Sequence, residues 1–178
     1  MAVLGQNFPA AAAVEWYGGS VTTWTSPGDA LTYGGYAANA GFTAPGSSDW
    51  LILTGYGFAV PPDCEVTDVA VHARASNGTG DPAVLRVKLQ STGIGVGTEK
   101  DSGQLPYVWA DAVFAGGPSY WGIPLTAAVV NDPSFGVRVR AVTEADGMDV
   151  KIDTVTVAVT YDDGYVVTGS FSLHVRRG

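Results

Sequence analysis

The sequence predicts an all-β protein, a single antiparallel β-sandwich of two packed sheets, and two observations lead to this fold class. Helix formers are scarce, because only three lysines and four glutamates occur among 178 residues, whereas Val, Thr, Tyr and Trp are plentiful. Five segments also alternate strictly between apolar and polar residues, which is the period of a half-buried strand. Each such strand has one apolar face, so two sheets must pack these faces together.

Turn-forming runs of Gly, Pro, Asn and Asp separate the alternating segments, which are the firmest strand predictions. These segments cover residues 68–75, 84–90, 135–142, 153–161 and 170–176. Weaker strands are expected near residues 21–25, 31–37, 51–56, 107–114 and 123–130. We expect about eight to ten strands and no helix longer than about two turns. The inward positions predict a core that contains Phe58, Val69, Val71, Leu85, Leu89, Val137, Val139, Val155 and Val157.

Two residues have predicted structural roles near the ends of the sandwich. Trp121 follows a Gly-Gly-Pro turn, where its large ring can close one end of the core. Asp153 has the same parity as Val155, so its carboxylate is expected to point inward. A buried carboxylate needs hydrogen-bond donors, which we expect to be loop N–H groups or a Trp indole.

The length allows one ordinary domain with a sizeable core. We expect an N-terminal arm over residues 1–20, a β-sandwich domain over 21–162, and a C-terminal strand or tail over 163–178. The arm has aromatic anchors but no sustained period, and the C-terminal segment has an apolar face that needs cover. Both ends are therefore expected to make assembly contacts through Phe8, Trp16, Tyr17, Phe171, Leu173 and Val175. The alternative for the C-terminal segment is that it completes one of the domain's own sheets.

Net charge, the cysteine and histidine counts, and hydropathy together disfavour several kinds of partner, metal site and membrane association. A formal net charge of −8 disfavours nucleic acid and anionic membranes. The single cysteine, Cys64, cannot form an internal disulfide, and two histidines are too few for a zinc site. No apolar stretch is long enough to span a membrane, and the N-terminus lacks the cationic region of a signal peptide. We expect no cofactor or metal, and synthesis in a host cytoplasm.

No set of residues predicts catalysis. His72 and His174 occupy outward positions on predicted strands, and no Gly-x-Ser-x-Gly motif accompanies them. The acids that could form a glycosidase pair lie mostly in or beside turns, where Asp is favoured for local reasons; they are Asp111, Glu144, Asp146, Asp149 and Asp153. A calcium site would use Glu144, Asp146, Asp149, Asp162 and Asp163, but their spacing matches no calcium-loop signature. We therefore expect no enzyme, and a hydrolase is the weakest alternative.

Two surface features suggest binding. Exposed aromatic residues could hold carbohydrate, although many of the aromatic residues must belong to the core. The candidates are Trp16, Tyr17, Trp24, Tyr33, Tyr36, Trp50, Tyr107, Trp109, Tyr120 and Trp121.

Cationic residues at outward positions would form one band if their strands share a sheet. That band would be a solvated face or a docking face for an acidic partner, formed by His72, Arg74, Arg86, Lys88, Arg138 and Arg140.

A series of fixed points across residues 24–162 resembles a known family. They are Trp24 with Pro27 and Ala30, Gly35-Tyr36-Ala37, Gly57-Phe58-Ala59-Val60-Pro61, Trp121-Gly122, Phe135-Gly136-Val137 and Asp153-Thr154-Val155-Thr156-Val157. The series resembles a jelly-roll-like β-sandwich domain of structural proteins in tailed bacteriophages and prophages.

The resemblance implies a non-enzymatic virion protein that contacts other capsid or tail proteins and copies of itself. Decoration of the capsid surface is the first expectation, and a neck, tail or tail-tip component is the second. A host-attachment module that binds cell-surface glycans is the alternative from a different functional class.

Overall fold

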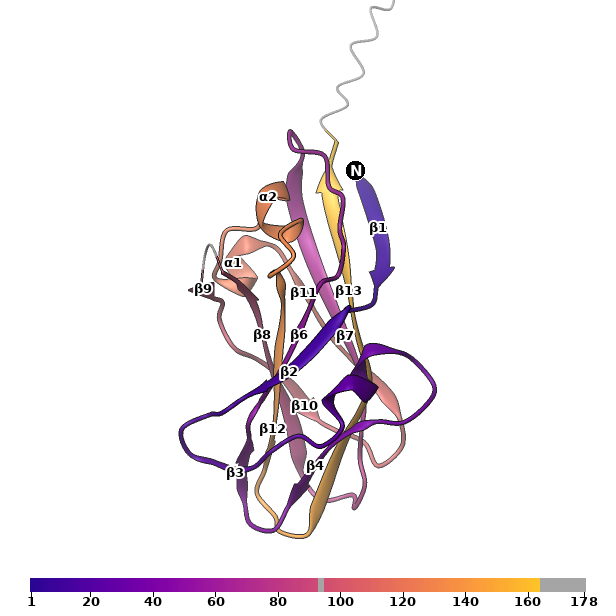
Figure 1. Ribbon diagram of the computed structural model, residues 1–178, viewed down its shortest axis with the longest axis vertical. Helices are drawn as coiled ribbons and strands as arrows, with labels where there is room; N and C mark the ends of the chain where they lie inside the picture. Colours follow the sequence, from indigo (N-terminus) through magenta and orange to yellow (C-terminus); the bar gives the residue numbers. More distant parts are fainter. Residues whose placement is uncertain (93–94, 164–178) are drawn as a thin grey trace, which may run out of the picture.

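The computed structural model describes residues 1–92 and 95–163, which form two β-sheets packed face to face (Figure 1). The strands are β1 (Ala2–Asn7), β2 (Ala11–Glu15), β3 (Ser20–Thr22), β4 (Ala38–Phe42), β5 (Gly46–Ser48), β6 (Trp50–Thr54), β7 (Glu65–Asn77), β8 (Ala83–Ser91), β9 (Gly95–Val96), β10 (Lys100–Gln104), β11 (Ala110–Gly116), β12 (Gly136–Thr143) and β13 (Met148–Asp162). Three short helices connect them: η1 (Pro27–Leu31), α1 (Pro118–Trp121) and α2 (Ala127–Val130).

The five-stranded sheet has the order β1-β13-β7-β11, and β4 pairs with β13 beyond the end of β1. The eight-stranded sheet has the order β10-β8-β12-β5-β3, with β6 beside β12, β2 beside β6 and β9 beside β8. Every pairing of named strands is antiparallel except β3 with β5, which is parallel. The predicted two-sheet β-sandwich is confirmed.

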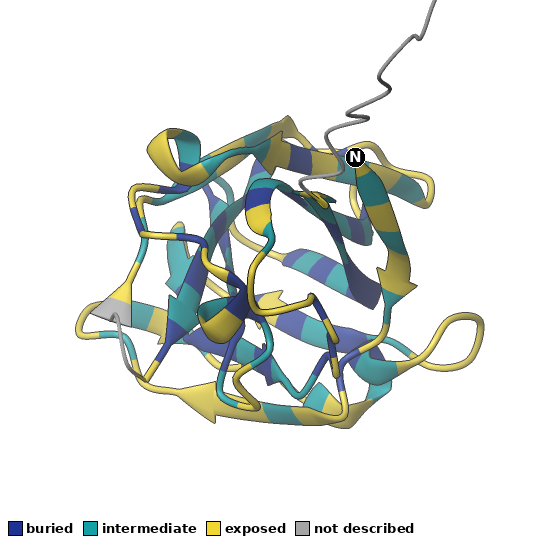
Figure 2. Cartoon of the chain, turned by 90° about the horizontal axis from the view of Figure 1, so that it is seen from above, coloured by how far each residue is buried: buried dark blue, intermediate teal, exposed yellow. Residues whose placement is uncertain are grey.

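The core lies between the two sheets and follows the alternation of the sequence. Figure 2 shows buried and less buried residues succeeding one another along the strands that surround the interior. All nine predicted core residues are buried, with Phe58 the most exposed of them at 6%. Trp121 is fully buried, and its indole N–H donates to the Val69 carbonyl over 3.0 Å, so its predicted position in the core is confirmed.

Three of the weaker strand predictions need correction. Residues 31–37 do not form a strand, because η1 ends at Leu31 and a glycine-containing loop follows it. Residues 123–130 contain α2 instead, whose first turn is capped where Thr126 Oγ1 accepts from the Val129 N–H over 3.3 Å. Residues 21–25 contribute only the end of the three-residue strand β3. The predicted strand at 170–176 lies outside the described residues.

Residues 1–20 differ from the expected arm, because they supply one strand to each sheet. β1 pairs with β13, and β2 pairs with β6 along its whole length. The Asn7 side chain donates to the Tyr56 carbonyl over 2.7 Å, where the chain leaves one sheet for the other. This pairing within the chain satisfies the backbone N–H and C=O groups of both segments, which the expected arm would instead have paired with a neighbouring protein. Small residues in β2 gave this segment no clear apolar period.

β13 contains a β-bulge that changes which of its residues face the core. Ile152 pairs with Ala75 and Thr154 pairs with Arg74, so Asp153 is an extra residue in the ladder. Residues of even number face the core before the bulge, and residues of odd number face it afterwards. The prediction that Asp153 points inward is therefore wrong: its carboxylate lies on the outer face of the sheet.

The register after the bulge can be tested with neighbouring substitutions. Val159→Asp buries an unpaired charge in the core and should lower the free energy of unfolding by about 4 kcal/mol or more. Thr160→Asp adds the same charge to a half-buried outward position and should cost about 1 kcal/mol. Denaturant unfolding measures both values, and equal losses would contradict this register.

Removal of residues 1–15 should destabilise the sandwich, because it uncovers the edges of β13 and β6. We expect a loss of about 3 kcal/mol or more, which lowers the Tm by roughly 6–12 °C. Trp16→Ala is the control, because this side chain is 75% exposed and should leave the Tm unchanged. An unaltered Tm after the deletion would show that the segment is a separable arm.

Candidate functional site

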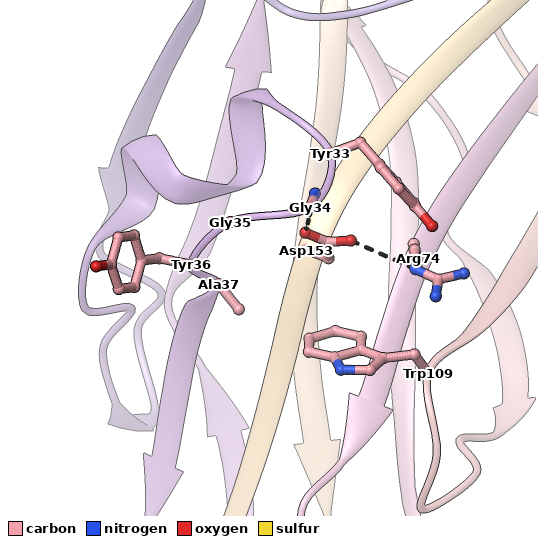
Figure 3. A pocket seen from close by; sticks show the side chains of 8 residues that line it. All are labelled: Tyr33, Gly34, Gly35, Tyr36, Ala37, Arg74, Trp109 and Asp153. Atoms are coloured by element: carbon pink, nitrogen blue, oxygen red, sulfur yellow. Dashed lines mark hydrogen bonds and ion pairs between the residues drawn. The ribbon is translucent and has the colours of Figure 1, made fainter.

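A groove of three adjoining hollows lies on the outer face of the five-stranded sheet, and we call it the aromatic groove. The central hollow, of about 240 Å³, is lined by Tyr33, Gly34, Gly35, Tyr36, Ala37, Arg74, Trp109 and Asp153 (Figure 3). The second, of about 230 Å³, is lined by Gln6, Phe8, Tyr33, His72, Arg74, Asp111, Thr154 and Thr156. The third, of about 360 Å³, is lined by Ser76, Gly78, Tyr107, Val108, Trp109 and Lys151.

An ion pair fixes the floor of the central hollow. Arg74 Nε lies 3.3 Å from Asp153 Oδ2, and the other carboxylate oxygen accepts from the Gly34 N–H over 3.0 Å. Asp153 therefore ties the loop of residues 32–37 to the sheet, as Figure 3 shows. Gly34 has a φ of 83°, a conformation that favours glycine, and this turn directs its N–H at the carboxylate. The expected hydrogen bond from a loop N–H to Asp153 is confirmed.

The β-bulge brings the polar residues of this floor together. Thr154 pairs with Arg74, and Asp153 is the extra residue next to it, so two neighbouring side chains of β13 face the groove at the bulge. Thr154 is 6% exposed, and its Oγ1 is buried with no hydrogen-bond partner among the described residues. The apolar residues of this segment have even numbers up to Ile152 and odd numbers from Val155 onward. This change is the signal in the sequence that could have revealed the bulge.

Aromatic side chains rise on both sides of this floor. Trp109, at 39% exposed, precedes β11, and Tyr33, at 63%, extends from the opposite loop with its ring 5.1 Å from the Arg74 guanidinium carbon. In Figure 3 these two rings flank the Arg74–Asp153 pair, whereas the Tyr36 side chain points away from it. Phe8 and Tyr107 are exposed in the two outer hollows. The site thus combines exposed flat apolar surfaces with fixed hydrogen-bonding groups.

The ten aromatic candidates from the sequence divide between the core and the surface. Trp24, Trp50 and Trp121 are buried. Tyr33, Tyr107 and Trp109 line the aromatic groove with exposed rings, and Tyr36 is exposed on the adjoining loop. Trp16 and Tyr17 follow β2 of the other sheet, and Tyr120 packs edge-on against Trp121. Composition alone could not separate these groups, because both consist of the same residue types.

The six cationic candidates do not form one band, because their strands belong to different sheets. His72 and Arg74 lie on β7 of the five-stranded sheet, at the floor of the aromatic groove. The other four lie on the neighbouring strands β8 and β12 of the eight-stranded sheet: Arg86, Lys88, Arg138 and Arg140.

The four cations of the eight-stranded sheet already have partners within the chain. Arg86 pairs with Asp101 and Arg140 with Glu99, each over 3.0 Å, and Arg138 pairs with Glu15 over 2.8 Å. The Lys88 amine lies 4.2 Å from the centre of the Trp50 ring. Burial lowers the pKa of Lys88, while nearby Glu99 opposes that shift. Their role as a docking face for an acidic partner stays a prediction.

The expected assembly contacts have different surroundings. Trp16 is 75% exposed and Phe8 is 48% exposed, so both rings are available on the surface. Tyr17 packs edge-on against Trp50 at 6.2 Å, and the Arg140 guanidinium carbon lies 4.3 Å from its ring, so Tyr17 anchors its own loop. Phe171, Leu173 and Val175 lie outside the described residues.

The acidic candidates are dispersed in the structure. Asp111 and Asp153 both line the aromatic groove, whereas Glu144 and Asp146 lie in the turn between β12 and β13. Within residues 1–92 and 95–163, no group of three or more His, Cys, Asp or Glu side chains is arranged to hold a metal ion. No helix in the same ranges is long and apolar enough to cross a membrane.

No protein-family model and no curated protein matches this chain. A family 35 carbohydrate-binding module from Clostridium thermocellum is similar in structure, with 12% identity over 89% of this chain and 98% of that chain and a TM-score of 0.43. The module TmCBM61, in complex with β-1,4-galactotriose, has 12% identity over 85% and 90% of the two chains and a TM-score of 0.42. A carbohydrate-binding module from Cellvibrio mixtus lichenase 5A, in complex with cellotriose, has 13% identity over 88% and 97% and a TM-score of 0.39.

Asp153→Ala should loosen the loop of residues 32–37, because it removes the acceptor for Gly34 and the partner of Arg74. We expect a loss of about 1–3 kcal/mol in stability and faster hydrogen exchange at the Gly34 amide. Asp153→Asn keeps one acceptor and should retain part of the protection. Unchanged exchange in both variants would show that the carboxylate does not hold the loop.

Proposed function

We propose that this protein is a non-catalytic carbohydrate-binding β-sandwich and that the aromatic groove holds the glycan. The observation that carries the proposal is the central hollow, where the exposed rings of Trp109 and Tyr33 flank the Arg74–Asp153 pair. A sugar ring has C–H faces that pack on aromatic rings and hydroxyl edges that hydrogen-bond to charged groups. The hollow offers both kinds of surface within the dimensions of a small ligand.

The polar groups of the hollow are positioned before a ligand arrives. Asp153 is held by Gly34 and Arg74, and the Arg74 guanidinium is held in turn by the carboxylate and the Tyr33 ring. Side chains that are already fixed lose little conformational entropy on binding. This lowers the free-energy cost of binding a polar ligand, such as a sugar, that binds with low affinity. Both oxygens of Asp153 already contact partners within the protein, an arrangement that suits a structural and binding role rather than catalysis.

The proposed biological setting is the virion of a tailed phage, where the protein would act as a host-attachment module for cell-surface glycans. The support for this setting is the resemblance of residues 24–162 to virion structural proteins. Decoration of the capsid and a position in the neck or tail are the competing locations. Quantitative mass spectrometry of purified particles separates them, because a capsid decoration protein is present in far more copies than a tail-tip protein.

Glycan binding should depend on Trp109. On an array of plant, bacterial and animal glycans, we expect the wild-type protein to bind a defined set and Trp109→Ala to weaken that binding at least about tenfold, which corresponds to about 1.4 kcal/mol. Trp16→Ala removes an exposed tryptophan next to the other sheet and should bind as the wild type does. The proposal fails if no glycan binds, or if both variants bind equally well.

A further inference from the structure

The three hollows form one row along the neighbouring strands β7 and β13. The central hollow shares Tyr33 and Arg74 with the second hollow and Trp109 with the third. On β7, the same-face residues Ser76, Arg74 and His72 belong to the third, central and second hollows in turn. At about 3.3 Å per residue these positions span roughly 13 Å, with a step of about 6.6 Å. Such a step is comparable to one sugar unit in an extended chain.

Each hollow has its own aromatic surface and its own polar group. Tyr107 and Lys151 occupy the third hollow, and Lys151 has no ion-pair partner within the described ranges. Phe8 and His72 occupy the second hollow, next to Thr154. The Thr154 hydroxyl, buried without a partner in the described part of the chain, is a group that a ligand hydroxyl or a bridging water could satisfy. The binding features of the central hollow are thus repeated on both sides of it.

From this repetition we infer that the ligand is a linear carbohydrate chain of three or more units, extended along β7 and β13, rather than a single sugar. This inference rests on the proposed function. A chain that occupies all three hollows gains contacts with each added unit, because the second and third units bind at high effective concentration. Three independent small ligands would not require hollows that share the side chains of Tyr33, Arg74 and Trp109.

The test is a chain-length series measured by titration calorimetry on the full chain. The probes are linear oligosaccharides of one to six units built from glucose, galactose, xylose or mannose, in α- and β-linked forms. In the series that binds, we expect affinity to rise by about tenfold or more from one unit to three and then to level off. Equal affinity for one unit and six units would overturn the inference and leave the proposed function standing. Binding of none of the probes would overturn both.

Substitutions in the outer hollows provide the second measurement. Phe8→Ala and Lys151→Ala should each weaken binding of the longest chain at least about threefold and leave the disaccharide, held in the central hollow, within about twofold of wild type. Lys100→Ala is the matched control, because this lysine lies over the Tyr120 ring on the other sheet and should change neither affinity. An unchanged affinity of both outer variants for the longest chain would confine the ligand to the central hollow and overturn the inference.

Discussion

The structure depends on a single extra residue in its longest strand. β13 pairs with β7, β1 and β4, so any change in its phase changes the whole five-stranded sheet. Because of the bulge at Asp153, Val150 and Ile152 before it and Val155 and Val157 after it all face the same core. Without that extra residue, one half of β13 would place its valines in solvent and its polar residues in the core. The bulge therefore reconciles two apolar patterns of opposite parity and, as a consequence, directs Asp153 at Arg74 on the outer face.

Local alternation predicts most of the sandwich but little of the site. Strict alternation in β7, β8, β12 and β13 produced correct strands and a correct core, because burial on one face dictates residue type. β1 and β2 were missed, because small residues and pairing at sheet edges leave no apolar period. The groove combines a loop, an N-terminal segment and three strands that are distant in sequence, so no local pattern identifies it. Asp153 shows the limit: its hydrogen-bonding need was predictable, but its direction depended on a ladder with Arg74.

The two outer faces of the sandwich differ in how their charges are used. On the eight-stranded sheet, Trp50 is buried beneath Lys88 and Arg140, and each arginine of that face has a carboxylate within 4 Å. These contacts pair the charges of that face within the same protein, and a hollow of about 450 Å³ lined by Glu15, Gln90 and Arg138 lies beside them. On the five-stranded sheet, the aromatic rings of Tyr33 and Trp109 stay exposed beside a polar floor. Within the described residues, four of the seven Lys and Arg side chains thus pair with carboxylates of the same protein. The exposed aromatic area beside the polar floor of the five-stranded sheet is the kind of surface that marks a binding site.

The position of the groove follows from a gap in the sheet edge. β1 pairs with residues 157–161 of β13, and β4 pairs with residues 148–152, so no strand of the described residues pairs with residues 153–156 on that side. The loop of residues 32–37 enters this gap and presents the Gly34 N–H to Asp153. A continuous strand there would hydrogen-bond along the edge of β13 and project its side chains alternately to the two faces of the sheet. The loop instead raises Tyr33 above the sheet, opposite Trp109, so the gap between β1 and β4 supplies one wall of the groove. The bulge in the β13–β7 ladder is a separate irregularity, and it positions Asp153 in the floor.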